Sequence, residues 1–259
     1  MRMRLVALLA LSCACGGGAL DAGDAGDGGL DAKPDHKPLH DAAIDTAAEL
    51  DASFERLTPH SDIVISAMRL RAVYVTGENT PPNFDALLSW MLASTDYWSV
   101  LAQYGVGYGT EDSVTVDAST FFPPGSVVDG IVGDWAIGEG IRGLAEADGG
   151  DAANAYIVFL PADINVDSPP CGWELGYHTT TGTIPFAVVP QCGASGLTVS
   201  HEIAEMATDP IPFAGWYSEA DEEPAGGEVG DLCAPGLREI DGYDVSLLWS
   251  NAAGDCAPK

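Results

Sequence analysis

Basic residues are scarce in this chain, which has 10 Lys and Arg against 39 Asp and Glu among its 259 residues. The formal net charge is −29 at pH 7. A chain this acidic repels the phosphates of nucleic acids and of anionic lipids. We therefore expect no nucleic-acid partner, and we expect any membrane contact to need a separate anchor.

No apolar run at the N-terminus is long enough to span a bilayer as a mature helix. Arg2 and Arg4 precede a short apolar segment, residues 5–11, which is typical of a secretory signal peptide over residues 1–15. The junction LSCACGGG resembles a bacterial lipobox, with Cys15 or else Cys13 as the lipidated residue. We expect an exported protein that is either lipid-anchored at the cell envelope or secreted.

Close C-x-x-C pairs, which many zinc sites use, are absent. Of six cysteines, two lie in the signal junction. The other four are Cys171, Cys192, Cys233 and Cys256. In an oxidising compartment, four thiols predict two disulfides, with three possible connectivities.

Aromatic residues are absent from residues 16–52, which are rich in Gly, Ala and Asp. Such a stretch cannot bury a core, so residues 16–59 are predicted to be a disordered acidic tether. Its Asp residues do not form the D-x-D-x-D-G pattern of a calcium loop. A single globular domain is expected over residues 60–259.

Apolar patterning in this domain predicts an α/β fold. Strands are expected over 68–77, 112–119, 155–163 and 183–192, and helices over 79–94, 96–104 and 133–147. Residues 155–163 are the most apolar and predict a central strand. Prolines at the margins of 183–192 favour an edge strand there.

A further helix is predicted to begin after Ser195, a suitable N-cap, and to end before Pro210. On it, His201 and Glu205 are i,i+4 neighbours. Four apolar residues at helical spacing predict an adjacent face that points to the core: Val199, Ile203, Met206 and Ala207.

This helix carries the sequence HEIAE, which is close to the H-E-x-x-H pattern of zinc peptidases. In that pattern two His bind zinc and the Glu after the first His takes a proton from water. Here His201 and Glu205 would be the metal ligands, and Glu202 the general base. The alternative is a polar helix face with a His–Glu hydrogen bond.

A tetrahedral site with one open position needs a third protein ligand. Glu228, 27 residues beyond His201, is the first candidate. Asp231 close behind it, Asp209 just past the helix and His178 before the preceding strand are the alternatives.

Four segments resemble the EXORDIUM or phosphate-induced family of secreted proteins, over roughly residues 68–251. They are YIVFLPADINV with CGWELGYH; PFAVVPQC; SHEIAEMATDP; and GWYSEADEEPAGGEVGDLC with VSLLWSN. The resemblance implies an extracytoplasmic protein, and the plant-type members are linked to cell expansion and growth signalling.

The resemblance also bears on the site. His201, Glu202 and Glu205 fall in the family's H-E-L-A-E signature. Glu228 and Asp231 fall in its E-x-x-D-L-C element, and His178 falls on its G-x-H. Leu175 stands where plant-type members have a second Cys, which implies one disulfide fewer than in those members.

These features predict a monomeric, zincin-like α/β (α+β) domain in which a mixed sheet packs on the HExxE helix. The expected function is an extracytoplasmic zinc-dependent metallopeptidase acting on peptides or cell-surface substrates, with strand 183–192 as the edge that binds extended substrate. The first alternative is a non-catalytic surface module with a structural metal or none. The second is a carbohydrate-active enzyme that uses paired carboxylates.

Overall fold

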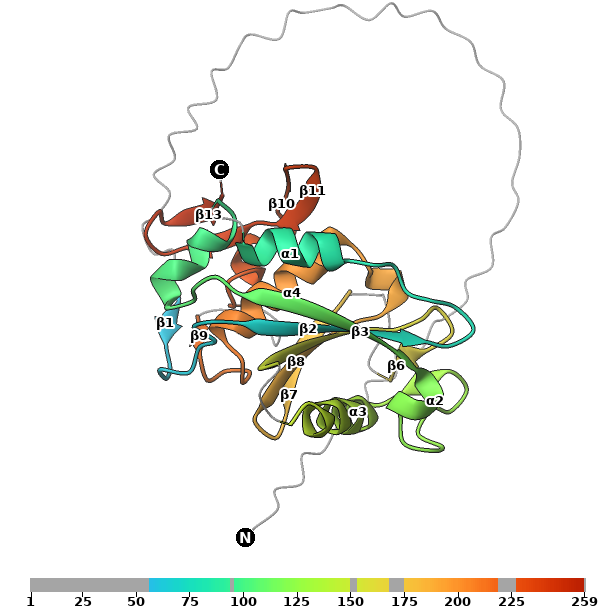
Figure 1. Cartoon of the computed structure of the whole chain (residues 1–259). Helices are drawn as coiled ribbons and strands as arrows, with labels where there is room; N and C mark the ends of the chain where they lie inside the picture. The colour runs from blue at the N-terminus through green and yellow to red at the C-terminus, as the bar shows by residue number, and fades with distance from the viewer. Residues whose placement is uncertain (1–55, 94–95, 150–152, 168–174, 219–226, 259) are drawn as a thin grey trace, which may run out of the picture. The chain divides into compact units, whose positions relative to one another are not determined.

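The centre of the domain is a five-stranded mixed sheet with helices on both faces (Figure 1). The computed structural model describes residues 56–93, 96–149, 153–167, 175–218 and 227–258. The strand order is β3 (Thr110–Asp117), β2 (Arg69–Thr76), β5 (Ala155–Phe159), β8 (Ile184–Val189) and β7 (Tyr177–Thr181). The first four are parallel and β7 runs antiparallel to β8. The predicted α/β class is confirmed.

The domain has two apolar cores, one on each face of the sheet, because successive side chains of a strand point to opposite faces. Tyr74, Phe159 and Val189 point to one face and pack with α1 (Asp85–Ala93), the 3₁₀ helix η1 (Trp98–Tyr104) and α4 (Gly196–Thr208). Val75 and Val158 point to the other, toward α2 (Ala118–Phe121) and α3 (Asp134–Ala147). Helices cover both faces of this sheet, and the central strands are therefore apolar at successive positions.

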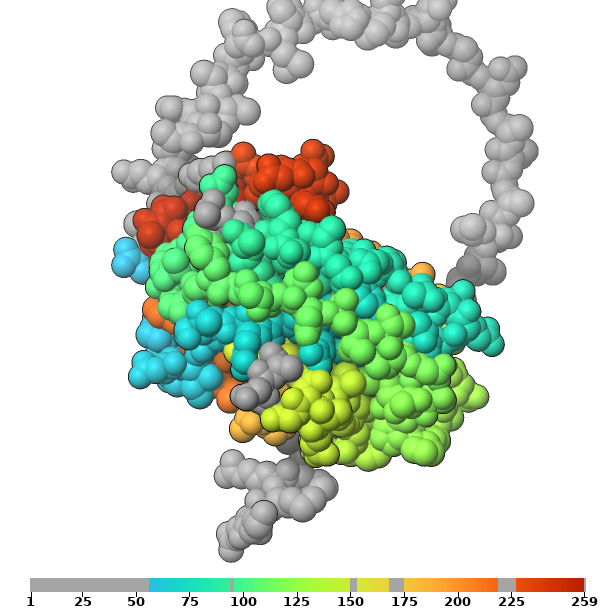
Figure 2. Space-filling model, viewed as in Figure 1, coloured from blue at the N-terminus to red at the C-terminus, as the bar shows by residue number. Residues whose placement is uncertain are grey.

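Short elements complete the α4 side of the sheet. The hairpin β10 (Leu237–Ile240) with β11 (Tyr243–Ser246) lies on α4, and β12 (Leu248–Ser250) pairs with β13 (Asp255–Ala257). The other short elements are β1 (Thr58–Pro59) with β9 (Trp216–Tyr217), β4 (Ile131–Val132) with β6 (Asn165–Val166), η2 (Gln191–Gly193) and η3 (Asp231–Cys233). Strand β12 packs on η1. The C-terminal part of the chain, red in Figure 2, lies beside α1, where the ring of Trp90 packs against Tyr243.

Most of the predicted elements are present, with small shifts at their ends. Helix α1 begins at Asp85 rather than near residue 79, because two prolines precede it and the side chain of Asn83 accepts the N–H of Asp85. Leu57, just before the predicted domain start, is buried. The predicted signal peptide, Cys13, Cys15, the tether up to residue 55 and Cys171 lie outside the described residues.

The prediction of an edge strand at residues 183–192 is wrong. Strand β8 is paired on both sides, with β5 and with β7. Pro185 precedes Phe186, the first β8 residue that pairs with β5, and Pro190 follows the strand, so neither interrupts that ladder. The antiparallel edge strand is β7, which the sequence pattern did not predict.

Among the described residues, no helix is both long and apolar enough to cross a membrane.

A disulfide joins η3 to β13 near the C-terminus. Cys233 and Cys256 are paired, with their Cα atoms 5.7 Å apart. Cys192 is also disulfide-bonded. The Cys233–Cys256 pairing occurs in one of the three connectivities allowed by the sequence.

We expect the double variant Cys233→Ser, Cys256→Ser to unfold with a free energy about 3 kcal/mol lower than wild type. The disulfide closes a loop with a sequence separation of 23 residues, and its loss frees the unfolded chain. Urea unfolding under oxidising conditions measures the change. An unfolding free energy equal to that of wild type would contradict the prediction.

Candidate metal centre

Helix α4 is buried on nearly all sides, and two of its buried side chains are carboxylates. The side chain of Ser195 accepts the N–H of Thr198 at 3.2 Å and starts the helix, as predicted. The helix packs on β7, β8 and β11. Glu202 and Glu205 are 6% and 3% exposed. Buried carboxylates are unfavourable unless they are paired or bind a cation.

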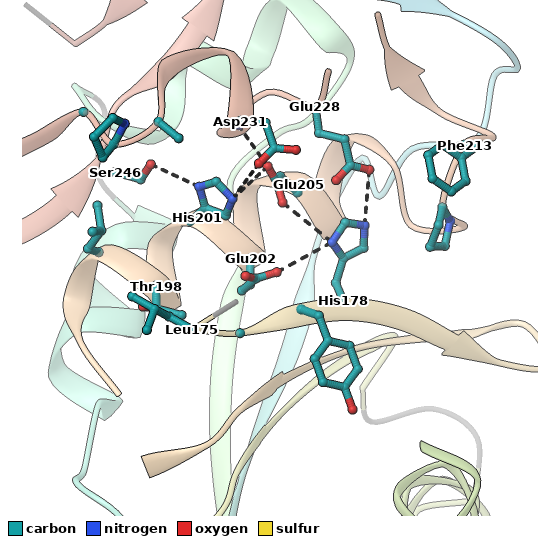
Figure 3. Close-up of a pocket in the computed structure, with 17 residues that line it drawn as sticks. Leu175, His178, Thr198, His201, Glu202, Glu205, Phe213, Glu228, Asp231 and Ser246 are labelled. Carbon is teal, nitrogen blue, oxygen red and sulfur yellow. Dashed lines mark hydrogen bonds and ion pairs between the residues drawn. The ribbon is translucent and has the colours of Figure 1, made fainter. Parts of the chain in front are cut away.

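The first cluster of ligand-type side chains surrounds His201 (Figure 3). His201 Nε2 lies 3.0 Å from Glu205 Oε1 and 3.3 Å from Asp231 Oδ1. The three residues offer ligand atoms that all lie within 4.8 Å of one another. The backbone N–H of Asp231 also donates to Glu205 Oε1 at 3.1 Å, which fixes η3 beside the helix. We call this set the His201 group.

The second cluster surrounds His178, which β7 brings over α4 (Figure 3). His178 Nδ1 lies 3.7 Å from Glu202 Oε2 and 3.8 Å from Glu205 Oε2, and its Nε2 lies 3.5 Å from Glu228 Oε1. His178, Glu205 and Glu228 again offer ligand atoms within 4.8 Å of one another. We call this set the His178 group; it shares Glu205 with the first.

Ser246 on β11 contacts the His201 ring. Its Oγ donates to the carbonyl of Leu247 at 3.1 Å and lies 3.4 Å from His201 Nδ1. The Oγ lone pairs therefore suit an Nδ1–H donor, which leaves the Nε2 lone pair facing Glu205 and Asp231. Two carboxylate oxygens around one lone pair repel it unless a proton or a metal ion lies between them.

Burial and like charges shift the titration of these side chains. Burial raises the pKa of Glu202 and of Asp231, and burial with the nearby charge of Glu205 raises the pKa of Glu228 to about 11. Burial alone would raise the pKa of Glu205, but the charge of His201 lowers it. Burial alone would lower the pKa of His201, but Glu205 and Asp231 raise it well above its usual value. Positive charge close to these buried carboxylates therefore stabilises their ionised forms.

Two glycines allow backbone to pass close to these side chains. A Cβ on Gly230 would lie 2.5 Å from His201 Nδ1 and 2.9 Å from Glu205 Oε1. A Cβ on Gly176 would lie 3.1 Å from Glu202 Oε1. Any other residue at position 230 would push His201 or η3 out of place.

The two groups lie in the wall of a cavity of about 470 Å³. Apolar residues line much of the rest of it: Leu175, Leu197, Pro212, Phe213, Ala234 and Pro235. Phe213 is 62% exposed and has a φ of 66°, a conformation unusual for a bulky residue. The cavity thus combines an anionic wall with an apolar rim.

Asp209 belongs to neither ligand group. Its fully buried carboxylate accepts the backbone N–H groups of Phe213, Ala214 and Gly215, at 2.7, 3.0 and 2.6 Å. These bonds hold the turn that presents Phe213 at the cavity rim.

We expect Asp209→Asn to lower the unfolding free energy by about 3 kcal/mol, since an amide can accept at only one of the two carboxylate oxygens and loses the charge. Urea unfolding measures this, with the exposed Asp244→Asn as the matched control. A change no larger than that of the control, about 0.5 kcal/mol, would contradict the assigned role.

Of the residues singled out from the sequence, His178, His201, Glu202, Glu205, Glu228 and Asp231 all line this cavity. Sequence reasoning missed Ser246, Gly230 and Phe213. Gly230 and Ser246 lie inside the family-like segments GEVGDLC and VSLLWSN but at positions that indicate no role of their own. Each of the three acts through a contact with a segment distant in the sequence or through backbone conformation.

Comparisons with protein-family models, with curated proteins and with solved structures find no match to this chain. Function is therefore inferred from geometry and chemistry.

Proposed function

We propose that the chain is an extracytoplasmic zinc-dependent hydrolase that cleaves peptide bonds. The observation that carries this is the His201 group, which lines an open cavity with the carboxylate of Glu202 beside it. The disulfides support an oxidising, extracytoplasmic location, and so do the signal-type N-terminus and the resemblance to the EXORDIUM family.

The spacing within the His201 group fits a tetrahedral ion. Zinc bonds of about 2.0–2.2 Å place neighbouring ligand atoms about 3.3–3.6 Å apart. His201 Nε2 lies 3.3 Å from Asp231 Oδ1, within this range. It lies 3.0 Å from Glu205 Oε1, a hydrogen-bond distance that would lengthen by a few tenths of an ångström around an ion. Three protein ligands leave one position open toward the cavity, and the imidazole favours zinc over calcium or magnesium.

Zinc bound here would polarise the substrate carbonyl and acidify water. Glu202 belongs to neither ligand group but lies on the same cavity wall. It is therefore placed to accept a proton from water and to return it to the leaving amine. Burial raises its pKa, a direction that helps a carboxylate hold the proton between these two steps.

Two features of the cavity suit an extended peptide. The start of β7, the edge strand, lines the cavity together with Leu175 and Gly176. A peptide can pair with such an edge through its backbone while a side chain enters the pocket. Phe213 and Leu175 favour an apolar side chain, and the carboxylates disfavour an acidic one.

The alternatives are less well supported. A structural metal in a surface module would have all its positions closed by protein, whereas each ligand group here supplies three residues and faces a cavity. A glycosidase pair needs two carboxyls facing a sugar groove. Here His178 lies close to both Glu202 and Glu228, so these carboxyls do not face one another across open space.

The test is to incubate the zinc-loaded full chain with a mixture of unstructured peptides and to identify the products by mass spectrometry, with and without a chelator. We expect cleavage next to apolar residues that stops when zinc is removed. Glu239→Gln, an exposed change on β10, is the control and should cleave like wild type. Zinc binding without cleavage of any peptide would overturn the proposal in favour of the surface module.

A further inference from the structure

The carboxylate of Glu205 faces two histidines, one with each oxygen. Oε1 lies 3.0 Å from His201 Nε2, and Oε2 lies 3.8 Å from His178 Nδ1 (Figure 3). Each histidine has a second carboxylate of its own, Asp231 for His201 and Glu228 for His178. Glu205 is therefore shared by two pairs of side chains, each made of one histidine and one acid.

The contacts of His178 are too long for hydrogen bonds, and the 3.5 Å between its Nε2 and Glu228 Oε1 matches the spacing of two ligands on one ion. Its nitrogens lie 3.5–3.8 Å from the carboxylate oxygens of Glu202, Glu205 and Glu228, whereas good N–H···O bonds measure about 2.7–3.2 Å. The Nε2 atom is buried and has no hydrogen-bond partner, and the side chain is 5% exposed. A buried, unpartnered ring nitrogen facing a carboxylate is what a site for a cation provides.

Charge also favours cations at this wall of the cavity. Four acidic side chains, Glu202, Glu205, Glu228 and Asp231, share the cavity wall, and no Lys or Arg is among the described residues that line it. Divalent ions bound here would replace the protons that these buried side chains otherwise hold and would supply the positive charge that the ionised carboxylates need.

We propose that the cavity binds two divalent cations bridged by the carboxylate of Glu205. His201 and Asp231 hold one, and His178 and Glu228 hold the other. The binding sites stand on their own geometry; only their role in peptide hydrolysis rests on the proposed function. In that role a second ion would help the first to stabilise the charge that develops during the reaction.

Zinc stoichiometry tests this without reference to activity. The full chain is stripped of metal with a chelator, loaded with Zn²⁺ and gel-filtered. Elemental mass spectrometry then measures the number of zinc ions per chain. Calorimetric titration with Zn²⁺ gives the affinities. We expect two tightly held ions in wild type, one in Asp231→Asn, one in Glu228→Gln, and weakened binding of both in Glu205→Gln.

Two exposed changes, Glu239→Gln and Asp244→Asn, are matched controls and should keep both ions. Circular dichroism shows whether each variant is folded, and the wild-type count decides the question even if a variant does not fold. One ion in wild type would overturn the two-ion proposal and leave the proposed hydrolase intact. Two ions with no peptide cleavage would support the two-ion site and overturn the hydrolase, and no tightly held zinc would overturn both.

Discussion

Glu202→Gln should lower the rate of peptide cleavage by about 10²–10⁴-fold while zinc content stays at the wild-type level. The amide keeps the size and burial of the carboxylate on α4, so the helix and its neighbours should pack as before. It cannot accept a proton from water. The loss should appear in kcat rather than in KM, because Glu202 is assigned to proton transfer and not to substrate binding.

Zinc analysis and steady-state kinetics on the same preparation check this. Glu239→Gln is the matched control, since it makes the same chemical change at an exposed position on β10. If Glu202→Gln retained full turnover with zinc bound, the assigned base would be wrong. If it lost zinc as well, Glu202 would be a ligand and not the base.

The part of the site on α4 could be predicted because its signals are local. Ser195 caps the helix, Pro210 follows its end, and i,i+4 spacing alone brings His201 beside Glu205. The strands β2 and β5 were predicted for a similar reason, since a run of buried apolar residues needs no distant partner to be recognised.

The contribution of β7 could not be predicted in the same way. The sequence YHTTT has little apolar character, and its strand forms by pairing with β8, where His178 lies opposite Ala187. That register points His178 to the α4 face, while Tyr177 reaches Asp134 at the start of α3 on the other face. The sequence therefore offered His178 only as an alternative ligand.

The contacts with β11 depend on tertiary packing alone. Ser200 on α4 accepts the backbone N–H of Ser246 at 2.8 Å, and this brings the Ser246 hydroxyl to His201. Nothing in the local sequence of β11 indicates a partner 46 residues away. Phe213 is similar, because propensity does not predict a positive φ for a bulky residue; Asp209 enforces it through three backbone bonds.

Zinc should stabilise the folded chain strongly, and Glu205→Gln should greatly reduce the effect. The ligands come from β7, α4 and the segment at η3, so they converge only in the native fold. A ligand at about 1,000 times its Kd that binds only the native state adds about 4 kcal/mol to the free energy of unfolding. For a domain of this size that is a rise in Tm of about 10 °C.

Thermal unfolding of chelator-treated chain, with and without Zn²⁺, measures this shift. Glu239→Gln should show the full shift. An equal shift in Glu205→Gln and in wild type would mean that the stabilising ion binds somewhere other than between His178 and His201.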